Sequence, residues 1–429
     1  MAKLWQKSGT KTHPLVTKYI ISKDCAQDKL LLKYDILASI AHAKMLAHVG
    51  LISKKEAFAL VRTLKEIFLL DKKGQFALKQ EDEDCHTAIE NYLVEKIGDI
   101  GKKIHMGRSR NDQVLTALRL YSKEKLQEVQ KQVLETAKTI LNFAQQHEFV
   151  PMPGYTHTQQ AMPSSVGQWA GAFVESLLDD VKLLEAAYEL NDQNPLGSAA
   201  GFGTSLPIDR EYTTKKLGFK KLQLNTLYCQ NSRGKIESFV VSALFQVMMT
   251  LGKIANDMVW FTSTEFSFFN VNKSLATGSS IMPQKQNLDI MEVLRANVHV
   301  VMSCQTQIQS VSLNLLSGYN KDLKITKKPL LEAFLIVLES LSIIKLLFSN
   351  IIPNLEKLEH AMHPEIFATD QVNRLAQEGI PFRDAYKKTA NVLNKIKPPN
   401  VIENLKSKKH LGAPGNLNLQ YYKNLIKRV

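Results

Sequence analysis

The sequence has few of the features that mark secreted, metal-binding or membrane proteins. Its four cysteines, at positions 25, 85, 229 and 304, are too few and too scattered for a disulfide framework, and they lack the CxxC spacing of zinc sites. The first ten residues hold no apolar segment like that of a secretory signal. The most apolar stretches are 239–251, which is too short to span a bilayer, and 334–352, which Glu339 and Lys345 interrupt. We therefore expect a reduced, soluble, cytoplasmic protein without membrane contact.

Strand patterns and breakers inside long segments are also scarce. Three long runs, 112–147, 165–191 and 235–276, contain no proline. The first of them is several times longer than the average globular helix of about 11–12 residues. Residues 28–49 place apolar side chains at mixed steps of three and four, which predicts an amphipathic helix. Long helices without sustained heptads indicate an all-α protein built as a helical bundle.

Acidic residues are in deficit, and most of the deficit lies at one end. The chain has 55 Lys and Arg against 41 Asp and Glu, a net charge of +14. Residues 387–429 hold ten basic side chains and a single acid, Glu403, so +9 of the +14 lies there. No recognised nucleic-acid motif accompanies this segment. Because lysine-rich surfaces are more often simply solvated, we expect no nucleic-acid partner.

Breakers cluster at four places between the helical runs. These clusters are Pro151–Gly154, Asn194–Pro207, Ala276–Pro283 and Leu316–Tyr319. Loops held by a rigid scaffold are common places for catalytic groups. The segment 278–287, GSSIMPQKQN, opens with small residues that allow a mobile backbone, and it offers a hydroxyl, a cation and an amide in Ser279, Lys285 and Asn287.

Two further segments are rich in donors and titratable groups. His157 follows a Pro-Gly break in PGYTHTQ at 153–159, where we expect it at the start of a helix and able to titrate near neutrality. GRSRNDQ at 107–113 places anion-binding donors at another expected helix start. No strand precedes the glycine-rich segment 197–204, so a dinucleotide fingerprint is not expected.

No metal or phosphate motif emerges. His360 and His363 have helical spacing, but no third ligand is evident, and we expect both at the surface. The chain has neither a Walker-type loop nor a GxSxG elbow. The sequence therefore predicts no metal site.

Together these segments resemble the argininosuccinate lyase family of the fumarase/aspartase superfamily. The superfamily signature GSSxMPxKxN matches from Gly278 to Asn287. The remaining family motifs occur in order along nearly the whole chain: SIAHAKML at 39–46, Glu83-Asp84 through His86 with Glu90, GRSRNDQ at 107–113, PGYTHTQ at 153–159, PLGSAAGFGTSLPIDRE at 195–211, SGYNKDL at 317–323 and EGIPFRDA at 378–385.

The resemblance implies a fold and an assembly. It implies an N-terminal helical domain over 1–106, a central long-helix domain over 107–356 and a small basic helical domain over 357–429. Four central domains would form a twenty-helix core in a homotetramer, and each active site would combine loops from three subunits. No cofactor is implied.

The resemblance also implies a reaction, the reversible elimination of argininosuccinate to arginine and fumarate. A base must remove a proton next to the succinyl carboxylate, the resulting charge must be stabilised, and an acid must protonate the departing guanidinium nitrogen. Ser279 would be the base, with its alkoxide stabilised by Lys285 and backbone amides, and His157 the acid, oriented by Glu292. The reverse assignment of Ser279 and His157 stays open.

The implied binding residues divide between the two halves of the substrate. The succinyl carboxylates would be held by Asn111, Thr156, Lys285 and Asn287, and the arginine half by Tyr319 and Lys327. The substrate-binding set also includes Asp24, Asp28, Arg110 and Lys324.

The sequence departs from the family pattern in four places. Asp24 stands where a serine is usual and Lys324 where a glutamine is usual, both in the region for the arginine half. Gln286-Asn287-Leu288 replaces Lys-Asn-Pro, and Arg233-Gly234 replaces Arg-Asp. A lyase acting on another N-substituted aspartate and a catalytically silent scaffold therefore remain as alternatives.

Overall fold

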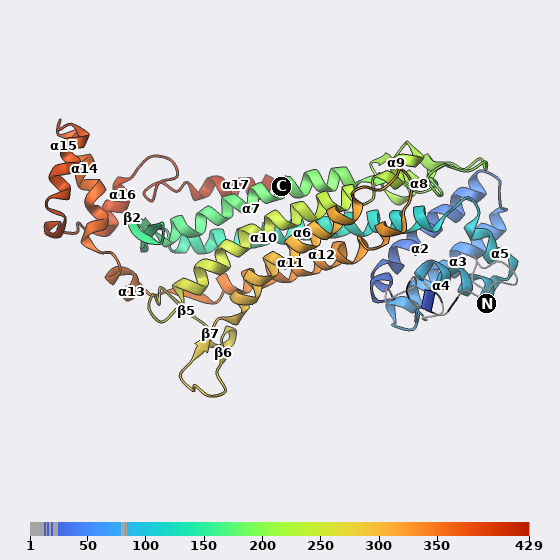
Figure 1. The fold of residues 1–429 in the computed structure, drawn as a ribbon, viewed down its shortest axis with the longest axis horizontal. Helices are drawn as coiled ribbons and strands as arrows, with labels where there is room; N and C mark the ends of the chain where they lie inside the picture. Colours follow the sequence, from blue (N-terminus) through green and yellow to red (C-terminus); the bar gives the residue numbers. More distant parts are fainter. Residues whose placement is uncertain are drawn as a thin grey trace. The chain divides into compact units, whose positions relative to one another are not determined.

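The chain is mainly helical, and its contacts divide it into two compact units. The computed structural model describes His13, Leu15, Val16, Tyr19, residues 25–78, Asp82 and residues 84–428. Unit 1 comprises Met1–Gln127, Ala187–Val240 and Gln305–Leu331, and unit 2 comprises Glu128–Ala186, Val241–Cys304 and Glu332–Val429. Figure 1 shows the elements in the colours of the sequence. Each unit combines segments that are distant in the chain.

Unit 1 begins with a small helical core. Its helices are α2 (Cys25–His48), α3 (Lys54–Lys72) and α4 (Cys85–Ile97), and α2 confirms the helix predicted over 28–49. Helix α3 starts at a capping box in which Ser53 and Glu56 each accept a backbone N–H of the other. Fully buried leucines from the three helices, such as Leu32, Leu60 and Leu93, pack together. Replacing one of them with alanine costs about 2–5 kcal/mol.

Shorter elements complete unit 1. They are α5 (Asp99–Lys102), η2 (Lys103–His105), β3 (Gln193–Asn194), α8 (Arg210–Leu217), β4 (Lys221–Leu222), α9 (Thr226–Asn231) and η4 (Lys321–Lys324). Strands β3 and β4 pair in parallel. The glycine-rich loop, defined here as residues 195–204, follows β3.

Five long helices carry the middle of the chain. They are α6 (Arg110–Gln146), α7 (Val166–Asn191), α10 (Lys235–Phe261), α11 (Asp289–Ser312) and α12 (Lys327–Phe348). The predicted runs 112–147 and 165–191 are confirmed by α6 and α7. The third run, predicted over 235–276, is wrong beyond Phe261. There the chain leaves the helix so that β5 (Phe269–Val271) can pair with β8 (Ile351–Pro353).

An aromatic cluster explains this early helix end. In unit 2 the ring of Trp169 lies 5.2 Å from that of Phe269 and 5.9 Å from that of Phe348, centroid to centroid. Phe261 and Phe143 contact the same rings. The indole Nε1 of Trp169 donates to Asp257 at 2.9 Å, so its polar end is satisfied. Burying these rings outweighs the helical preference of the segment after α10.

Two hairpins in unit 2 carry residues of interest. Strands β1 (Pro151–Thr156) and β2 (Gln159–Ser165) are antiparallel, as are β6 (Thr277–Gly278) and β7 (Gln286–Asn287). The prediction that His157 starts a helix is wrong, because His157 and Thr158 form the turn between β1 and β2 with φ of 53° and 62°. Positive φ at two successive turn residues suits the twist of a two-residue hairpin.

The rest of unit 2 consists of short helices. They are η3 (Lys273–Leu275), α13 (Leu355–His360), η5 (Pro364–Phe367), α14 (Ala368–Gln377), α15 (Phe382–Ala390), η6 (Leu393–Lys395), α16 (Val401–Ser407) and α17 (Leu419–Arg428). His360 and His363 are exposed, as predicted.

Among the described residues, α10 alone is long and apolar enough to cross a membrane. More than half of its most apolar window, 56 %, is buried inside the protein. Burial of this kind is typical of a core helix of a globular protein.

Candidate active site

A buried ion pair joins two of the predicted binding residues in unit 1. Lys327 Nζ, in the first turn of α12, lies 2.6 Å from Asp28 Oδ1 in the first turn of α2. Both side chains are buried. Because two buried charges need partners, each residue fixes the position of the other. The structure therefore brings together Asp28 and Lys327, which are 299 positions apart in the chain.

Arg110 lies at the start of α6 and contacts the start of α4. Its Nη2 donates to Thr87 Oγ1 at 2.8 Å, and its Nε lies 3.6 Å from Asp84 Oδ2. Asp84 caps α4 by accepting the backbone N–H of Thr87 at 2.9 Å. Burial raises the pKa of Asp84, but His86, Arg110 and the bonds from Thr87 outweigh it, so the pKa lies below its ordinary value. Asp84 therefore stays ionised beside Arg110.

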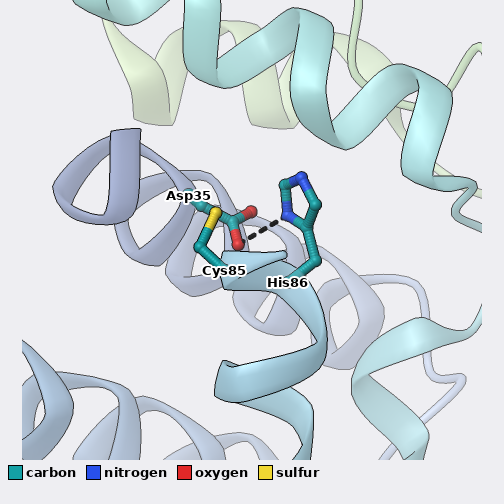
Figure 2. Close-up of side chains that lie close together, drawn as sticks. All are labelled: Asp35, Cys85 and His86. Atoms are coloured by element: carbon teal, nitrogen blue, oxygen red, sulfur yellow. Dashed lines mark ion pairs between the residues drawn. The ribbon is translucent and has the colours of Figure 1, made fainter. Parts of the chain in front are cut away.

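Next to this cap lies the buried cluster of Asp35, Cys85 and His86, shown in Figure 2. His86 Nδ1 is 2.7 Å from Asp35 Oδ2, and both side chains are almost fully shielded from solvent. Burial alone would lower the pKa of His86, but the negative charge of the nearby Asp35 outweighs burial and raises the pKa. Burial, followed by the Asp35 charge, raises the pKa of the Cys85 thiol well above its ordinary value.

The three side chains of this cluster are all possible metal ligands, but their geometry favours an ion pair. Nitrogen and oxygen ligands about 2.0–2.2 Å from a tetrahedral zinc ion would lie roughly 3.3 Å apart. The observed 2.7 Å between Nδ1 and Oδ2 is too short for that arrangement. The distance therefore fits a histidine paired with a carboxylate better than two ligands of one zinc ion. The raised pKa of His86 favours its protonated form, and the raised pKa of Cys85 favours its neutral form.

Tyr319 and Lys324 lie on the segment between α11 and α12. The guanidinium of Arg233 is 5.2 Å from the centre of the Tyr319 ring, and its Nη2 donates to the carbonyl of Leu323 at 3.3 Å. Asn231 Oδ1 accepts the N–H of Gly318 at 2.7 Å. These contacts hold the predicted loop in place. Lys324 ends η4 and is half-buried.

Ser279 lies in the loop between β6 and β7 of unit 2. Its Oγ accepts two backbone N–H groups, from Ile281 at 3.4 Å and from Met282 at 3.1 Å. The N–H of Lys285 donates to the carbonyl of Met282 at 3.0 Å, which closes the turn. Two backbone donors directed at one hydroxyl oxygen stabilise negative charge on that oxygen.

The other residues predicted from the superfamily signature follow on the same segment. Asn287 belongs to β7 and is half-buried, and Lys285 is exposed. Glu292 is exposed in the first turn of α11. Thr277 Oγ1 donates to Asp289 Oδ2, which ties the start of the hairpin to the start of α11. The signature therefore forms one hairpin anchored to a helix.

Thr156 and His157 lie at the tip of the β1–β2 hairpin, and both side chains are exposed. In the described part of the chain, no hydrogen bond or ion pair joins His157 to Ser279, Lys285 or Glu292. Figure 1 draws the two hairpins of unit 2 at separate places. Asn111, in the first turn of α6, is half-buried, and Asp24 lies outside the described residues.

Comparison with known proteins places the chain in a family. The family model described as Lyase matches residues 11–303. An argininosuccinate lyase of Thermotoga neapolitana is 45 % identical over 388 residues, which cover 90 % of this chain and 97 % of the relative. The chain belongs to the argininosuccinate lyase family. A second family member, from Sorangium cellulosum, is 42 % identical over 97 % of this chain and 96 % of its own length.

The solved structures agree on the fold. A crystal structure of EDDS lyase in complex with formate has a TM-score of 0.80 at 20 % identity, over 98 % of this chain and 90 % of that chain. At this identity the likeness shows the fold alone, and it confirms the predicted all-α, fumarase/aspartase-like class. The argininosuccinate lyase family is one of soluble metabolic enzymes.

Sequence reasoning missed part of this family member's charged cluster. The sequence patterns assign no role to Asp35, and Asp84, Cys85 and His86 occur only within one family motif. The signal available was that Asp35 is a polar residue within an otherwise apolar helical pattern, whereas His86 follows an acidic run and gives no such signal. Their pairing depends on the packing of α2 against α4, which no local pattern reveals.

Proposed function

We propose that this chain catalyses the reversible elimination of argininosuccinate to L-arginine and fumarate in arginine biosynthesis, in the cytoplasm and without a cofactor. Relatives named argininosuccinate lyase, at 42–45 % identity over about 90 % of the chain or more, carry the proposal. The arrangement of the Ser279 turn supports the same chemistry.

Ser279 acts as the base for the succinyl half. A serine hydroxyl is too weakly acidic to ionise unaided, so its alkoxide needs donors already in place. The N–H groups of Ile281 and Met282 supply two donors, and the ammonium of Lys285 on the same turn supplies positive charge when the loop closes. Lys285 and Asn287, with Asn111 and Thr156, hold the succinyl carboxylates, where charge accumulates after proton removal.

His157 protonates the departing guanidinium nitrogen. Its exposed position at the tip of the β1–β2 hairpin lets it reach a substrate that lies outside its own hairpin. Glu292, at the start of α11, orients the imidazole and stabilises its protonated form.

The charged cluster of unit 1 binds the arginine half. An amino acid with a guanidinium group presents two cationic groups and one carboxylate. Asp28 and Asp84 provide anionic partners, and Lys327 and Arg110 provide cationic ones. Tyr319, held by Arg233, contributes an aromatic face that suits a planar guanidinium. Asp24 and Lys324 complete the binding set.

The active protein is a homotetramer with active sites shared between subunits. The separate positions of the two unit 2 hairpins support this, because one chain alone leaves Ser279 without contact to His157. Helix α11 also exposes aliphatic side chains, with exposed fractions of 59 % for Val293 and 44 % for Met302. Apolar faces of this kind are typical of subunit interfaces.

Fumarate formation tests the function directly. Purified protein is mixed with argininosuccinate, and the absorbance of fumarate at about 240 nm is followed while arginine is measured separately. Equal release of both products is expected. A folded oligomer that releases neither product would refute the proposal.

Because Lys324 stands where the family pattern has glutamine, the choice of amine half needs a separate test with several substrates. Several N-substituted aspartates are supplied under the same conditions, and the amine product of each is identified. Argininosuccinate is expected to give the highest kcat/KM. Faster turnover of another N-substituted aspartate would reassign the amine half while leaving the elimination chemistry in place.

A further inference from the structure

A single buried carboxylate, that of Asp112, joins the start of α6 to the glycine-rich loop. The side chain of Asp112 is fully buried. Its Oδ1 accepts the N–H of Ser109 at 2.9 Å. Its Oδ2 accepts two N–H groups of the facing loop, from Gly197 at 2.9 Å and from Ala199 at 3.0 Å. Three backbone donors on one carboxylate therefore tie together two segments that are distant in the sequence.

The loop that Asp112 holds has a strained backbone. Gly197 has φ of 84°, and Ala199 has φ of 51°, a left-handed conformation that is uncommon for alanine. On the other side of the loop, Arg210 Nε donates to the carbonyl of Leu196 at 3.0 Å. Such a conformation persists only when its surroundings fix it, and the bond from the Ala199 N–H to Asp112 is one of the contacts that do so.

We propose that ionised Asp112 is a positioning residue: it fixes Asn111 and the glycine-rich loop in one arrangement, and this arrangement binds the succinyl end of the substrate. Asp112 itself does not touch the substrate. The inference rests on the proposed function, in which the neighbouring Asn111 holds a succinyl carboxylate.

The cost of keeping Asp112 charged argues against a purely structural role. Burial raises the pKa of Asp112 to about 6, although the three N–H donors and Arg108 act to lower it. Because the pKa is raised above that of the unfolded chain, the ionised form lowers folding stability at neutral pH. Buried groups with strongly shifted pKa values, kept at a cost in stability, are typical of functional sites.

The charges around Asp112 are few. Arg108, on the segment before α6, acts on it electrostatically and donates to Ser39 Oγ at 2.9 Å, while Asp35 of α2 and Glu90 of α4 act on Arg108 in turn. The glycine-rich loop carries no ionisable side chain. Below about pH 6 the carboxyl is expected to become neutral and to hold the loop N–H groups less tightly.

The variant Asp112→Asn in the full-length assembled protein tests this role. An amide of the same shape keeps one acceptor oxygen but directs an NH2 group at some of the backbone donors. We expect kcat/KM for argininosuccinate to fall at least 10-fold, mainly through a higher KM. Asp209→Asn is the matched control. Asp209 caps α8 by accepting the N–H of Tyr212 at 2.9 Å but is partly exposed.

The pH profile and hydrogen exchange give readouts that a structural role would not move. Below pH 6, log kcat/KM of the wild type is expected to fall with a slope one proton steeper than that of Asp112→Asn. Amide protection of the loop, measured by hydrogen-exchange mass spectrometry and corrected for intrinsic rates, is expected to be lower at pH 5 than at pH 7.5 in the wild type. At both pH values it is expected to be low in the variant.

Several results would overturn the inference. These are wild-type kcat/KM in Asp112→Asn, loop protection that does not change with pH in the wild type, and a lowered Tm with an unaltered pH slope. Exchange does not depend on turnover. If the wild type releases no fumarate, the proposed function fails, and the exchange measurement still decides whether Asp112 holds the loop.

Discussion

Lys327 and Asp28 form a buried ion pair, with 2.6 Å between Nζ and Oδ1, across a chain separation of 299 positions. The pair links the first turn of α12 to the first turn of α2 and so connects two distant segments of the chain within unit 1. Two charges in a buried place need each other, and each is also suited to one charged group of an amino acid. The pair therefore fixes the two first turns relative to each other, and in the proposed function it also binds the arginine half of the substrate.

Removing one partner of this pair should be far more harmful than removing both. Lys327→Met leaves the Asp28 carboxylate buried without its cation, so we expect a loss of about 3–5 kcal/mol in the free energy of unfolding. The double variant Asp28→Asn/Lys327→Met should recover most of that loss but should not recover activity. Urea unfolding and fumarate assays on the single and double variants measure both effects.

The exposed pair of Lys33 and Glu124 gives the control for this comparison. Both side chains are at least 40 % exposed. Lys33→Met should therefore cost about 0–1 kcal/mol. Equal losses in the free energy of unfolding for Lys33→Met and Lys327→Met would show that burial does not make the Asp28 pair more important for stability.

The pairing of His86 with Asp35 should make stability fall as the pH rises. Because the folded state holds the pKa of His86 above its ordinary value, the pair contributes fully below about pH 6.5. That contribution is lost as the pH rises through the folded pKa. We expect His86→Gln to lower Tm more at pH 6.5 than at pH 9, by differential scanning fluorimetry at fixed protein concentration. His360→Gln, at an exposed position, should lower Tm equally little at both.

Gly234 stands where the family pattern has an acid, and the structure explains why a side chain does not fit there. Its φ is 78°, and a Cβ would lie 1.8 Å from Ser312 Oγ. Gly234→Ala should therefore combine backbone strain with a steric clash. Gly74→Ala, with φ of 69° and open space around its Cβ, isolates the strain. We expect Gly234→Ala to lower Tm more than Gly74→Ala does. Adding Ser312→Gly should remove the clash and reduce the Tm loss of Gly234→Ala to that of Gly74→Ala.

The sequence predicted the elements of this protein better than their contacts. Helices α2, α6 and α7 follow from apolar spacing and from the absence of proline, which act locally. The early end of α10 depends on aromatic rings that several segments bring together. A prediction from helical propensity alone therefore makes this helix too long. The Pro-Gly break before His157 resembles a helix start in the sequence, whereas the left-handed backbone of His157 makes a hairpin turn.

The same distinction applies to the candidate site: residues that are close in the chain could be predicted from the sequence, and contacts between packed helices could not. Ser279, Lys285 and Asn287 are close in the chain, so their motif alone placed them on one loop. The pairs Lys327–Asp28 and His86–Asp35 form only when helices pack, and sequence spacing does not predict such packing. Asp112 could be read as a helix-start residue, but its two bonds to the glycine-rich loop could not.

The left-handed backbone at His157 determines which variant is informative. Asparagine tolerates positive φ better than most residues, so His157→Asn should keep the hairpin while removing the proposed acid. We expect kcat to fall roughly 10²–10⁴-fold with an unchanged circular dichroism spectrum and oligomeric state. Thr158→Asn, at the next turn position, is the control for hairpin geometry. A kcat near that of the wild type in His157→Asn would remove its role as the acid.

Ser279→Ala should separate catalysis from folding most cleanly. The N–H groups of Ile281 and Met282 that donate to Ser279 Oγ lie in an exposed loop, so water replaces the lost acceptor and Tm should hardly change. We expect turnover of argininosuccinate to fall roughly 10²–10⁴-fold. The control is Ser274→Ala, which removes an exposed hydroxyl that donates to Asn272 at 2.9 Å, whereas Ser279 is half-buried. If both variants turn over at the wild-type rate, the base must be sought elsewhere, and the two N–H donors would serve only to shape the turn.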